Sequence, residues 1–263
     1  MFTETVEELI MVKRVDLEKW LNDYLNVSQV NDWLPNGLQI EGREGIEKIV
    51  TAVSINMDVI KSAVDEKADA LIVHHGMFWQ KEEQRIINYR KSRIKLLLEH
   101  DINLFAYHLP LDYHPEISHN RLILEGISAT KIVNQASLPR ELDVGLAGYF
   151  EPPLPIDQLL KRIEDFFKSK PGVFLFGEKD IYSIFVVSGA GRTLTDKVAF
   201  AGFDTYLTGD VSETIPAIAK ETKLNYIYCG HYNTEKPGII ALGQKIKENF
   251  DVDVRFVDVP NSL

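Results

Sequence analysis

The sequence contains a single cysteine, Cys229, among 263 residues, and this excludes a framework of intrachain disulfide bonds. Cys229 lies in the apolar stretch NYIYCG, where we expect it to be a small buried side chain. No stretch of the sequence approaches the roughly 18 consecutive apolar residues that a membrane span requires. The N-terminal segment is acidic and has no apolar core of the kind found in a secretion signal. Together these absences predict a cytoplasmic protein.

Basic residues are fewer than acidic residues, with 29 Lys and Arg against 39 Asp and Glu, and the formal net charge is -10. A net negative field opposes the approach of a polyanion, so the composition disfavours a general nucleic-acid binder. What the chain does contain is a hydrophobic fraction of 45%, which is enough to build one large or two modest cores. An ordinary soluble globular protein fits this composition.

Runs of β-branched and apolar residues alternate with helix-period segments through most of the chain, and this alternation predicts an α/β fold with buried, largely parallel strands. An amphipathic helix is expected over residues 156–167, after a cluster of prolines. A further helix is expected to begin near Met11 with Asp16 as its N-cap. We expect strands at residues 48–55, 70–73, 102–108, 173–176, 182–187, 205–208, 226–229 and 253–257, with helices between most of them.

Two lobes are expected, with the boundary near Glu141. The predicted division is 1–141 and 142–263, and the C-terminal segment is expected to return to the first lobe. A weak internal repeat relates AVSINMDVIKSAVDEKADALIVHHG to VVSGAGRTLTDKVAFAGFDTYLTGD and aligns Asp69 with Asp204. Two unrelated strand-helix-strand units of similar composition would give the same pattern, so duplication and chance both remain open.

Polar side chains follow three of the predicted strands, at the ends where α/β sheets place their ligands. His74 and His75 end the strand LIVHH, and Gly76 would help both rings to reach one pocket. Asp112 follows the next strand, after the stiff sequence HLPL. His231 and Glu235 follow a later strand with the i,i+4 spacing that places two side chains on one helical face.

Each of these patterns has a structural alternative: surface histidines, a turn aspartate, and a solvated helix start. Taken together, three imidazoles and two carboxylates are too many for one tetrahedral site, and they suffice for two divalent ions that share a water. A mixed nitrogen and oxygen shell without thiolate suits Zn, Mn, Fe, Co or Ni. The sequence therefore predicts a dinuclear metal centre formed by His74, His75, Asp112, His231 and Glu235.

Several motifs in order resemble the Nif-three-like dinuclear-metal family, which includes the GTP cyclohydrolase type 2 homologues. These motifs are NGLQIEG, LIVHHG, YHLPLD, SGAG, YLTGD and GHYNTE, and they span nearly the whole chain. The resemblance implies two similar α/β lobes with mixed, largely parallel sheets, assembled as a homohexameric ring. It implies the same five metal ligands, with Glu235 bridging two divalent ions, and hydrolytic opening of the guanine ring of GTP with release of formate.

The sequence departs from the family pattern after Asp112, where Tyr113 and His114 are bulky and polar, and this puts the substrate in doubt. A phosphoesterase acting on another nucleotide-like substrate and a non-enzymatic metal-binding scaffold remain as alternatives. His108 is the candidate for proton transfer, because an imidazole near the predicted ligands titrates near neutral pH. We expect His114 and His119 to be loop residues.

The stretch SGAGR, which ends in Arg192, has two interpretations. It can be a tight packing turn, or it can present backbone N–H groups and a guanidinium to phosphate. We expect Phe78, Trp79 and Tyr89, which follow the histidine pair, to be core residues.

Overall fold

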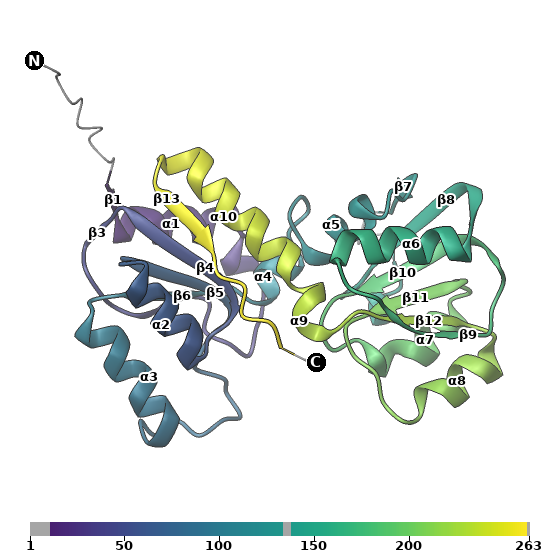
Figure 1. Ribbon diagram of the computed structural model, residues 1–263, viewed down its shortest axis with the longest axis horizontal. Coiled ribbons are helices and arrows are strands. Elements are labelled where there is room, and N and C mark those ends of the chain that lie inside the picture. Colours follow the sequence, from purple (N-terminus) through teal and green to yellow (C-terminus); the bar gives the residue numbers. More distant parts are fainter. Residues whose placement is uncertain (1–10, 134–137, 262–263) are drawn as a thin grey trace, which may run out of the picture. The chain divides into compact units, whose positions relative to one another are not determined.

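The computed structural model describes residues 11–133 and 138–261, and the chain forms two compact units. Of the described residues, the first unit contains 11–114 and 239–259, and the second contains 115–133, 138–238 and 260–261 (Figure 1). The C-terminal segment thus returns to the first unit, whereas the division falls earlier in the chain than the predicted boundary at Glu141. The reason is that α5 (His119–Gly126) contributes Ile123 and Leu124 to the core of the second unit.

The first unit is built on a five-stranded sheet in the order β13-β4-β5-β6-β2. Three of its four strand pairings are parallel, and only β2 runs antiparallel to its neighbour. A short ribbon pairs β1 (Val12–Lys13) with β3 (Gly45–Ile46). The strands of the main sheet are β2 (Gly37–Ile40), β4 (Lys48–Ser54), β5 (Ala70–His75), β6 (Asn103–Ala106) and β13 (Asp253–Phe256).

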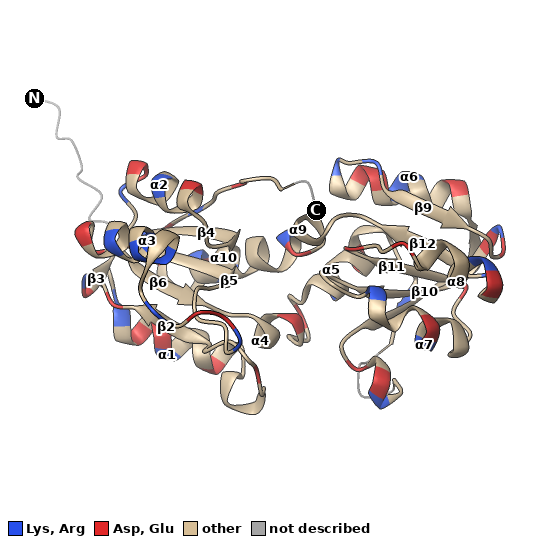
Figure 2. Ribbon diagram, turned by 90° about the horizontal axis from the view of Figure 1, so that it is seen from below, with Lys and Arg blue, Asp and Glu red and all other residues tan. Residues whose placement is uncertain are grey.

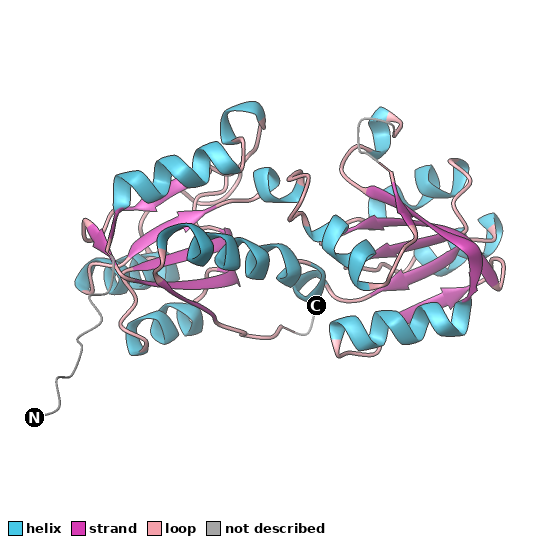
Figure 3. Cartoon of the chain, turned by 90° about the horizontal axis from the view of Figure 1, so that it is seen from above, coloured by secondary structure: helices cyan, strands magenta, loops and turns pink. Residues whose placement is uncertain are grey.

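Helices cover both faces of this sheet because its buried strands are apolar on both sides. Val50, Leu71 and Leu104 face the core shared with α2 (Met57–Asp65) and α3 (Asn88–Glu99). Figure 3 shows helices on both sides of this sheet. On the opposite face, Gly243 of α10 (Lys236–Phe250) lies against Thr51 of β4. The ring of Trp20 in α1 (Arg14–Tyr24) packs against Phe250 of α10. Helix α1 begins at Arg14, so Asp16 lies in its first turn and not at the predicted N-cap position.

The second unit is built on a six-stranded sheet in the order β7-β8-β10-β11-β12-β9. Only two of its five pairings, β10 with β11 and β11 with β12, are parallel. The predicted mixed α/β architecture is therefore confirmed, and the parallel character is stronger in the first sheet. The strands are β7 (Lys131–Ile132), β8 (Leu146–Pro155), β9 (Gly172–Leu175), β10 (Asp180–Val187), β11 (Thr205–Thr208) and β12 (Asn225–Tyr228).

Alternate residues of β10, β11 and β12 face two different helical layers. Val186, Leu207 and Ile227 pack with α5 and with α6 (Ile156–Phe167), the amphipathic helix expected over these residues. Figure 2 shows that α6 carries both acidic and basic residues. Among them are Lys161 and Asp165, which form an ion pair. The other face of the sheet packs with α7 (Thr195–Phe200) and α8 (Ile215–Thr222).

The two sheets repeat one chain path, strand-helix-strand-helix-strand, with matching polar clamps. The Asp69 carboxylate accepts hydrogen bonds from two consecutive backbone N–H groups at the start of β4, and the Asp204 carboxylate does the same in the first half of β10. The side chains of Asn103 and Asn225, at the starts of β6 and β12, each brace the loop after the antiparallel edge strand. These shared contacts favour duplication over chance as the origin of the repeat.

Short elements complete the fold within the described residues. They are the helical turns η1 (Val27–Gln29), α4 (Leu109–Asp112), η3 (Arg140–Leu142), η4 (Arg192–Leu194) and α9 (His231–Thr234). Helices α4 and α9 occupy corresponding places in the repeat, directly after β6 and β12. No helix in the described ranges has the length and apolar composition needed to cross a membrane.

Candidate metal centre

His74 and His75 are the last two residues of β5, and each ring is held through its Nδ1 atom. Nδ1 of the fully buried His74 lies 3.0 Å from the carbonyl oxygen of Tyr107. Because a carbonyl only accepts, Nδ1 carries the proton, and Nε2 is the basic nitrogen of this ring. Nδ1 of His75 lies 2.9 Å from the hydroxyl of Ser54 on the neighbouring strand. With Nδ1 engaged in this way, Nε2 is the atom of each ring that can bind a metal.

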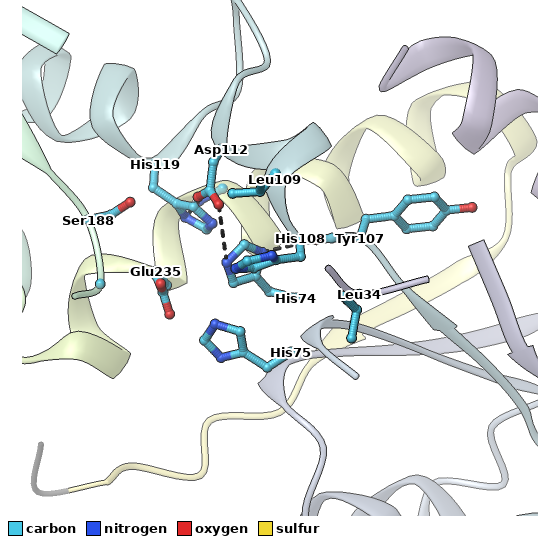
Figure 4. Close-up of polar contacts among 12 residues, drawn as sticks. Leu34, His74, His75, Tyr107, His108, Leu109, Asp112, His119, Ser188 and Glu235 are labelled. Atoms are coloured by element: carbon cyan, nitrogen blue, oxygen red, sulfur yellow. Dashed lines mark hydrogen bonds and ion pairs between the residues drawn. The ribbon is translucent and has the colours of Figure 1, made fainter. Parts of the chain in front are cut away.

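Neighbouring residues of a strand point to opposite faces, yet the centroids of these two rings lie only 4.6 Å apart (Figure 4). The chain leaves the strand immediately afterwards at Gly76, as expected. A Cβ atom on Gly76 would lie 2.4 Å from the amide oxygen of Gln39 and 2.6 Å from the Cβ of Ala106. Glycine is therefore required here because there is no room for a side chain.

His108 adds a third imidazole to this end of the sheet, with its ring centroid 5.0 Å from that of His74 and 5.6 Å from that of His75. Its Nδ1 lies 3.0 Å from Oδ1 of Asp32, a carboxylate from the loop before β2. The rings of Trp33 and Trp79 approach His108 edge-on. His108 is thus held in a specific orientation by a buried acid and two aromatic side chains.

The carboxyl of Asp32 is strongly perturbed by its surroundings. Burial raises the pKa of this carboxyl, but hydrogen bonds from His108, Asn36 and the backbone N–H of Leu109, with the charge of His108, outweigh burial and lower the pKa to about 2. Its side chain is only 2% exposed, so the ion is sheltered from solvent screening. Asp32 therefore remains ionised at neutral pH, and it acts only as an acceptor toward Nδ1 of His108.

Asp112 lies at the end of α4, the helical turn that follows β6. Pro110 occupies the first turn of this helix, where a missing N–H is tolerated. Oδ2 of Asp112 lies 3.8 Å from Nε2 of His74 (Figure 4). Two ligands of one ion at bond lengths of about 2.0–2.2 Å are separated by a similar distance.

The residues of the first unit therefore have the chemistry of a metal site. One ring nitrogen from each of His74, His75 and His108 lies within 4.8 Å of the others. In metal sites the ring nitrogen that is not bound to the ion is usually hydrogen-bonded to a carboxylate, carbonyl or similar group, as Nδ1 of each of these rings is. Buried imidazole and carboxylate groups at this end of the sheet fit a divalent ion.

His231 is the first residue of α9 and Glu235 directly follows its last residue, and Nε2 of His231 lies 3.1 Å from Oε2 of Glu235. Glu235 is 5% exposed. Gly189, at a φ of +65°, lies directly against this pair, because a Cβ atom there would be 2.2 Å from Oε1 of Glu235. The i,i+4 spacing seen in the sequence thus does bring an imidazole and a carboxylate together. His108 and Asp112 have the same spacing in the sequence at the corresponding turn of the first unit.

Other residues have structural roles that differ in part from expectation. His114 and His119, expected in loops, are 6% and 0% exposed, and Nδ1 of His119 accepts the backbone N–H of Gly238. Cys229 is buried in the core as predicted, and burial raises the pKa of its thiol. Trp79 packs against the core of the first unit, whereas Tyr89 is 60% exposed.

The SGAGR turn uses its backbone N–H groups internally. Side-chain oxygens of Asn120, Thr234, Thr208 and Asp210 accept the N–H groups of residues 188, 189, 191 and 192, in that order. The packing interpretation of this turn is therefore favoured over a backbone phosphate cradle.

No motif or spacing in the sequence links Asp32, Ser54 or the carbonyl of Tyr107 to the imidazoles that these three groups orient. Asp32 is 76 positions from His108, and no short spacing connects them. The one sequence feature that points to Asp32 is the turn NDWLPNG before β2, which contains this acid and two asparagines.

The chain is similar to known proteins over nearly its full length. The model of the Duf34/NIF3 (NGG1p interacting factor 3) family matches residues 12–262. A protein of Yersinia pestis named GTP cyclohydrolase 1 type 2 homolog is 37% identical over 253 residues, covering 95% of this chain and 99% of the relative. A protein of the same name from Escherichia coli (strain K12) is also 37% identical, with 95% and 99% covered.

Solved structures show the same similarity. Protein ybgI, described as of unknown function, has a TM-score of 0.89 and 36% identity, with 96% of this chain and all of that chain covered. TTHA1606 from Thermus thermophilus has a TM-score of 0.87 and 31% identity, with coverage of 96% and 100%. The chain therefore belongs to the Duf34/NIF3 family.

Proposed function

We propose that the protein is a dinuclear metal-dependent hydrolase that opens the guanine ring of GTP and releases formate. His74, His75, Asp112, His231 and Glu235 would hold two divalent ions, and Glu235 would bridge them. The observation that carries the proposal is the orientation of the imidazoles in the first unit, each held through Nδ1 by an oxygen partner. Relatives named as GTP cyclohydrolase homologues support the choice of substrate.

When bound, the ions would supply Lewis-acid activation of water. Two water molecules add in turn at C8 of guanine. The first addition opens the ring by breaking the C8–N9 bond, and the second breaks the C8–N7 bond, so that this carbon leaves as formate and both nitrogens gain a proton. The side chains around His108 define its part in this chemistry. Asp32 fixes the proton on Nδ1, so Nε2 is the atom that accepts a proton from water and returns it to the opened ring. The rings of Trp33 and Trp79 restrict the access of bulk water to this imidazole.

The proposal extends to assembly as a homohexamer in the cytoplasm. Support comes from the family resemblance and from apolar side chains at and beside α3, where Ile86, Tyr89 and Leu98 are more than half exposed. A side chain of this kind is stabilised when a partner covers it. Six chains of 30.0 kDa give a mass of about 180 kDa, which light scattering measures directly.

The test of the proposed function begins with metal-free protein reloaded with Mn, Zn or Fe. We expect two ions per chain, and formate with a fluorescent pterin precursor from GTP. Glu235→Ala should lower the metal stoichiometry and abolish turnover together. Glu248→Ala is the matched control, because Glu248 is an exposed carboxylate that pairs with Lys245.

The alternatives give different results in the same experiment. Cleavage of a generic phosphoester without formate from GTP would replace the guanine-opening activity with phosphoesterase activity. Two tightly held ions with no turnover of any substrate would favour the non-enzymatic scaffold. Full activity in metal-free protein, or in Glu235→Ala with no bound metal, would refute a metal-dependent hydrolase.

A further inference from the structure

The second unit contains a cavity of about 580 Å³ at the carboxyl ends of its parallel strands. Its walls come from the turns after β10, β11 and β12 and from the segment before β9. Strand ends of this kind are the usual ligand position in an α/β sheet, and the volume suits a small molecule of nucleotide size. The lining includes Lys170, Arg192, Asp210, Tyr228 and His231.

The internal repeat relates the position of this cavity to the histidine pair of the first unit. The register that aligns Asp69 with Asp204 also aligns His74 with Gly209 and His75 with Asp210. Where the first unit carries two imidazoles, the second unit carries a glycine with no room for a side chain. A Cβ atom on Gly209 would lie 2.6 Å from the carbonyl oxygen of Gly189. The strand ends that line the cavity thus correspond to the strand ends of the first unit at which a metal site is predicted.

Hydroxyl groups from the sheet brace the turns of the cavity. The hydroxyl of Tyr206 donates to the carbonyl of Gly191 at 2.6 Å, and the hydroxyl of Tyr226 donates to the carbonyl of Asp210 at 2.7 Å. Burial raises the pKa of both tyrosines, so both hydroxyls keep their protons as donors. A preformed wall loses little conformational entropy when a ligand binds.

The charge of the lining is opposite to that of the chain. Lys170 and Arg192 contribute two positive charges and Asp210 one negative charge, in a protein whose formal net charge is -10. Asp210 orients Arg192 by pairing with its NH1 group and by accepting its backbone N–H at 2.8 Å. A guanidinium has five N–H donors, so an oriented Arg192 retains donors for an anion in the cavity.

We propose that this cavity binds a phosphorylated small molecule, with its phosphate groups on Lys170 and Arg192. The aromatic ring of Tyr228 offers a surface on which a planar ring can stack. His231, a proposed metal ligand, also lines the cavity, so the bound molecule would lie beside the proposed centre. That the bound molecule is the substrate rests on the proposed function. That the cavity binds phosphate does not depend on it.

Binding measurements on metal-free full-length protein test the phosphate site independently of catalysis. The probes are inorganic tripolyphosphate, GTP and guanosine, measured by isothermal titration calorimetry. We expect Lys170→Ala and Arg192→Lys each to weaken the binding of tripolyphosphate and GTP about tenfold or more. Lys170→Ala removes a charge-assisted contact, and Arg192→Lys keeps the charge but loses the planar guanidinium whose paired N–H groups match phosphate oxygens. Binding of guanosine should change less than twofold. Lys197→Ala, at an exposed lysine of α7 outside the lining, is the matched control.

The outcomes separate this inference from the proposed function. Tripolyphosphate that does not bind the wild-type protein, or that binds Lys170→Ala and Lys197→Ala equally well, overturns the phosphate site. Phosphate-dependent binding without formate from GTP upholds the site and removes the proposed reaction. Formate production with a KM for GTP that is unchanged in Lys170→Ala and Arg192→Lys refutes the cavity while the reaction stands. Lys170 is exposed, so its replacement leaves the fold intact, and thermal unfolding verifies this.

Discussion

Replacing Asp32 by asparagine isolates the ion pair that orients His108. The pKa of Asp32 falls from 3.8 to about 2 in the folded protein. Since one unit of pKa corresponds to about 1.4 kcal/mol, the ionised carboxylate stabilises the fold by about 2 kcal/mol at neutral pH. The amide introduced by Asp32→Asn carries no charge and loses this contribution. We therefore expect the free energy of unfolding of the first unit to fall by about 2 kcal/mol at pH 7.

The pH dependence gives the sign of the effect. A carboxyl whose folded pKa is lowered contributes stability that is complete above its unfolded pKa of 3.8 and is lost as the pH falls through about 2. At pH 3 roughly half of the contribution remains, so the difference between wild type and Asp32→Asn should shrink to about 1 kcal/mol.

Tryptophan fluorescence during urea unfolding measures this effect in the right part of the molecule, because Trp20, Trp33 and Trp79 all belong to the first unit. The experiment is run with chelator, so bound metal does not contribute. Glu83→Gln is the control, since Glu83 is an exposed carboxylate of the same unit that pairs with Arg85. An Asp32→Asn effect that is equal at pH 3 and pH 7, or no larger than that of Glu83→Gln, would refute the assigned pair.

Three further substitutions or reactions test other contacts. Gly189→Ala places a methyl group against Glu235 and should destabilise the second unit by at least about 1 kcal/mol more than Gly202→Ala, which has a positive φ but open space; equal losses would show that backbone strain alone is responsible. Asn225→Ala removes two hydrogen bonds to the backbone and should cost about 2 kcal/mol in chemical denaturation, and a neutral result would contradict the clamp. Cys229 should resist alkylation in the folded protein at pH 8 and react on unfolding, because burial raises the pKa of its thiol; rapid labelling of the folded chain would contradict this.

Much of the architecture could be predicted because hydrophobic periodicity is a local signal. Helix α6 occupies residues 156–167, as its apolar spacing indicated. The proline cluster was misleading as a boundary marker, because β8 runs through Pro152, Pro153 and Pro155. Among the described residues, β7 pairs with Gly148 and Tyr149 and no strand pairs with the proline-containing part of β8 on that edge, where a missing N–H is tolerated.

The candidate site could be predicted only where its residues follow strand ends. His74, His75 and Asp112 follow strands of one sheet, and the structure brings them together with His108. Asp32 comes from a loop that is distant in sequence, and its contact with His108 depends on tertiary packing that no spacing rule describes. The cavity of the second unit also depends on tertiary packing and could not be predicted from the sequence, because its lining comes from several separate turns.

The discontinuity of the first unit has a consequence for biosynthesis. Its sheet needs β13 beside β4, and its second face needs α10, yet both follow nearly all of the second unit in the sequence and leave the ribosome after it. The second unit is almost continuous in sequence and needs no such late segment for its sheet. During translation the first unit, which begins to emerge before the second, is therefore completed after it. Until β13 is available, β4 has an unpaired edge at which the nascent chain can aggregate.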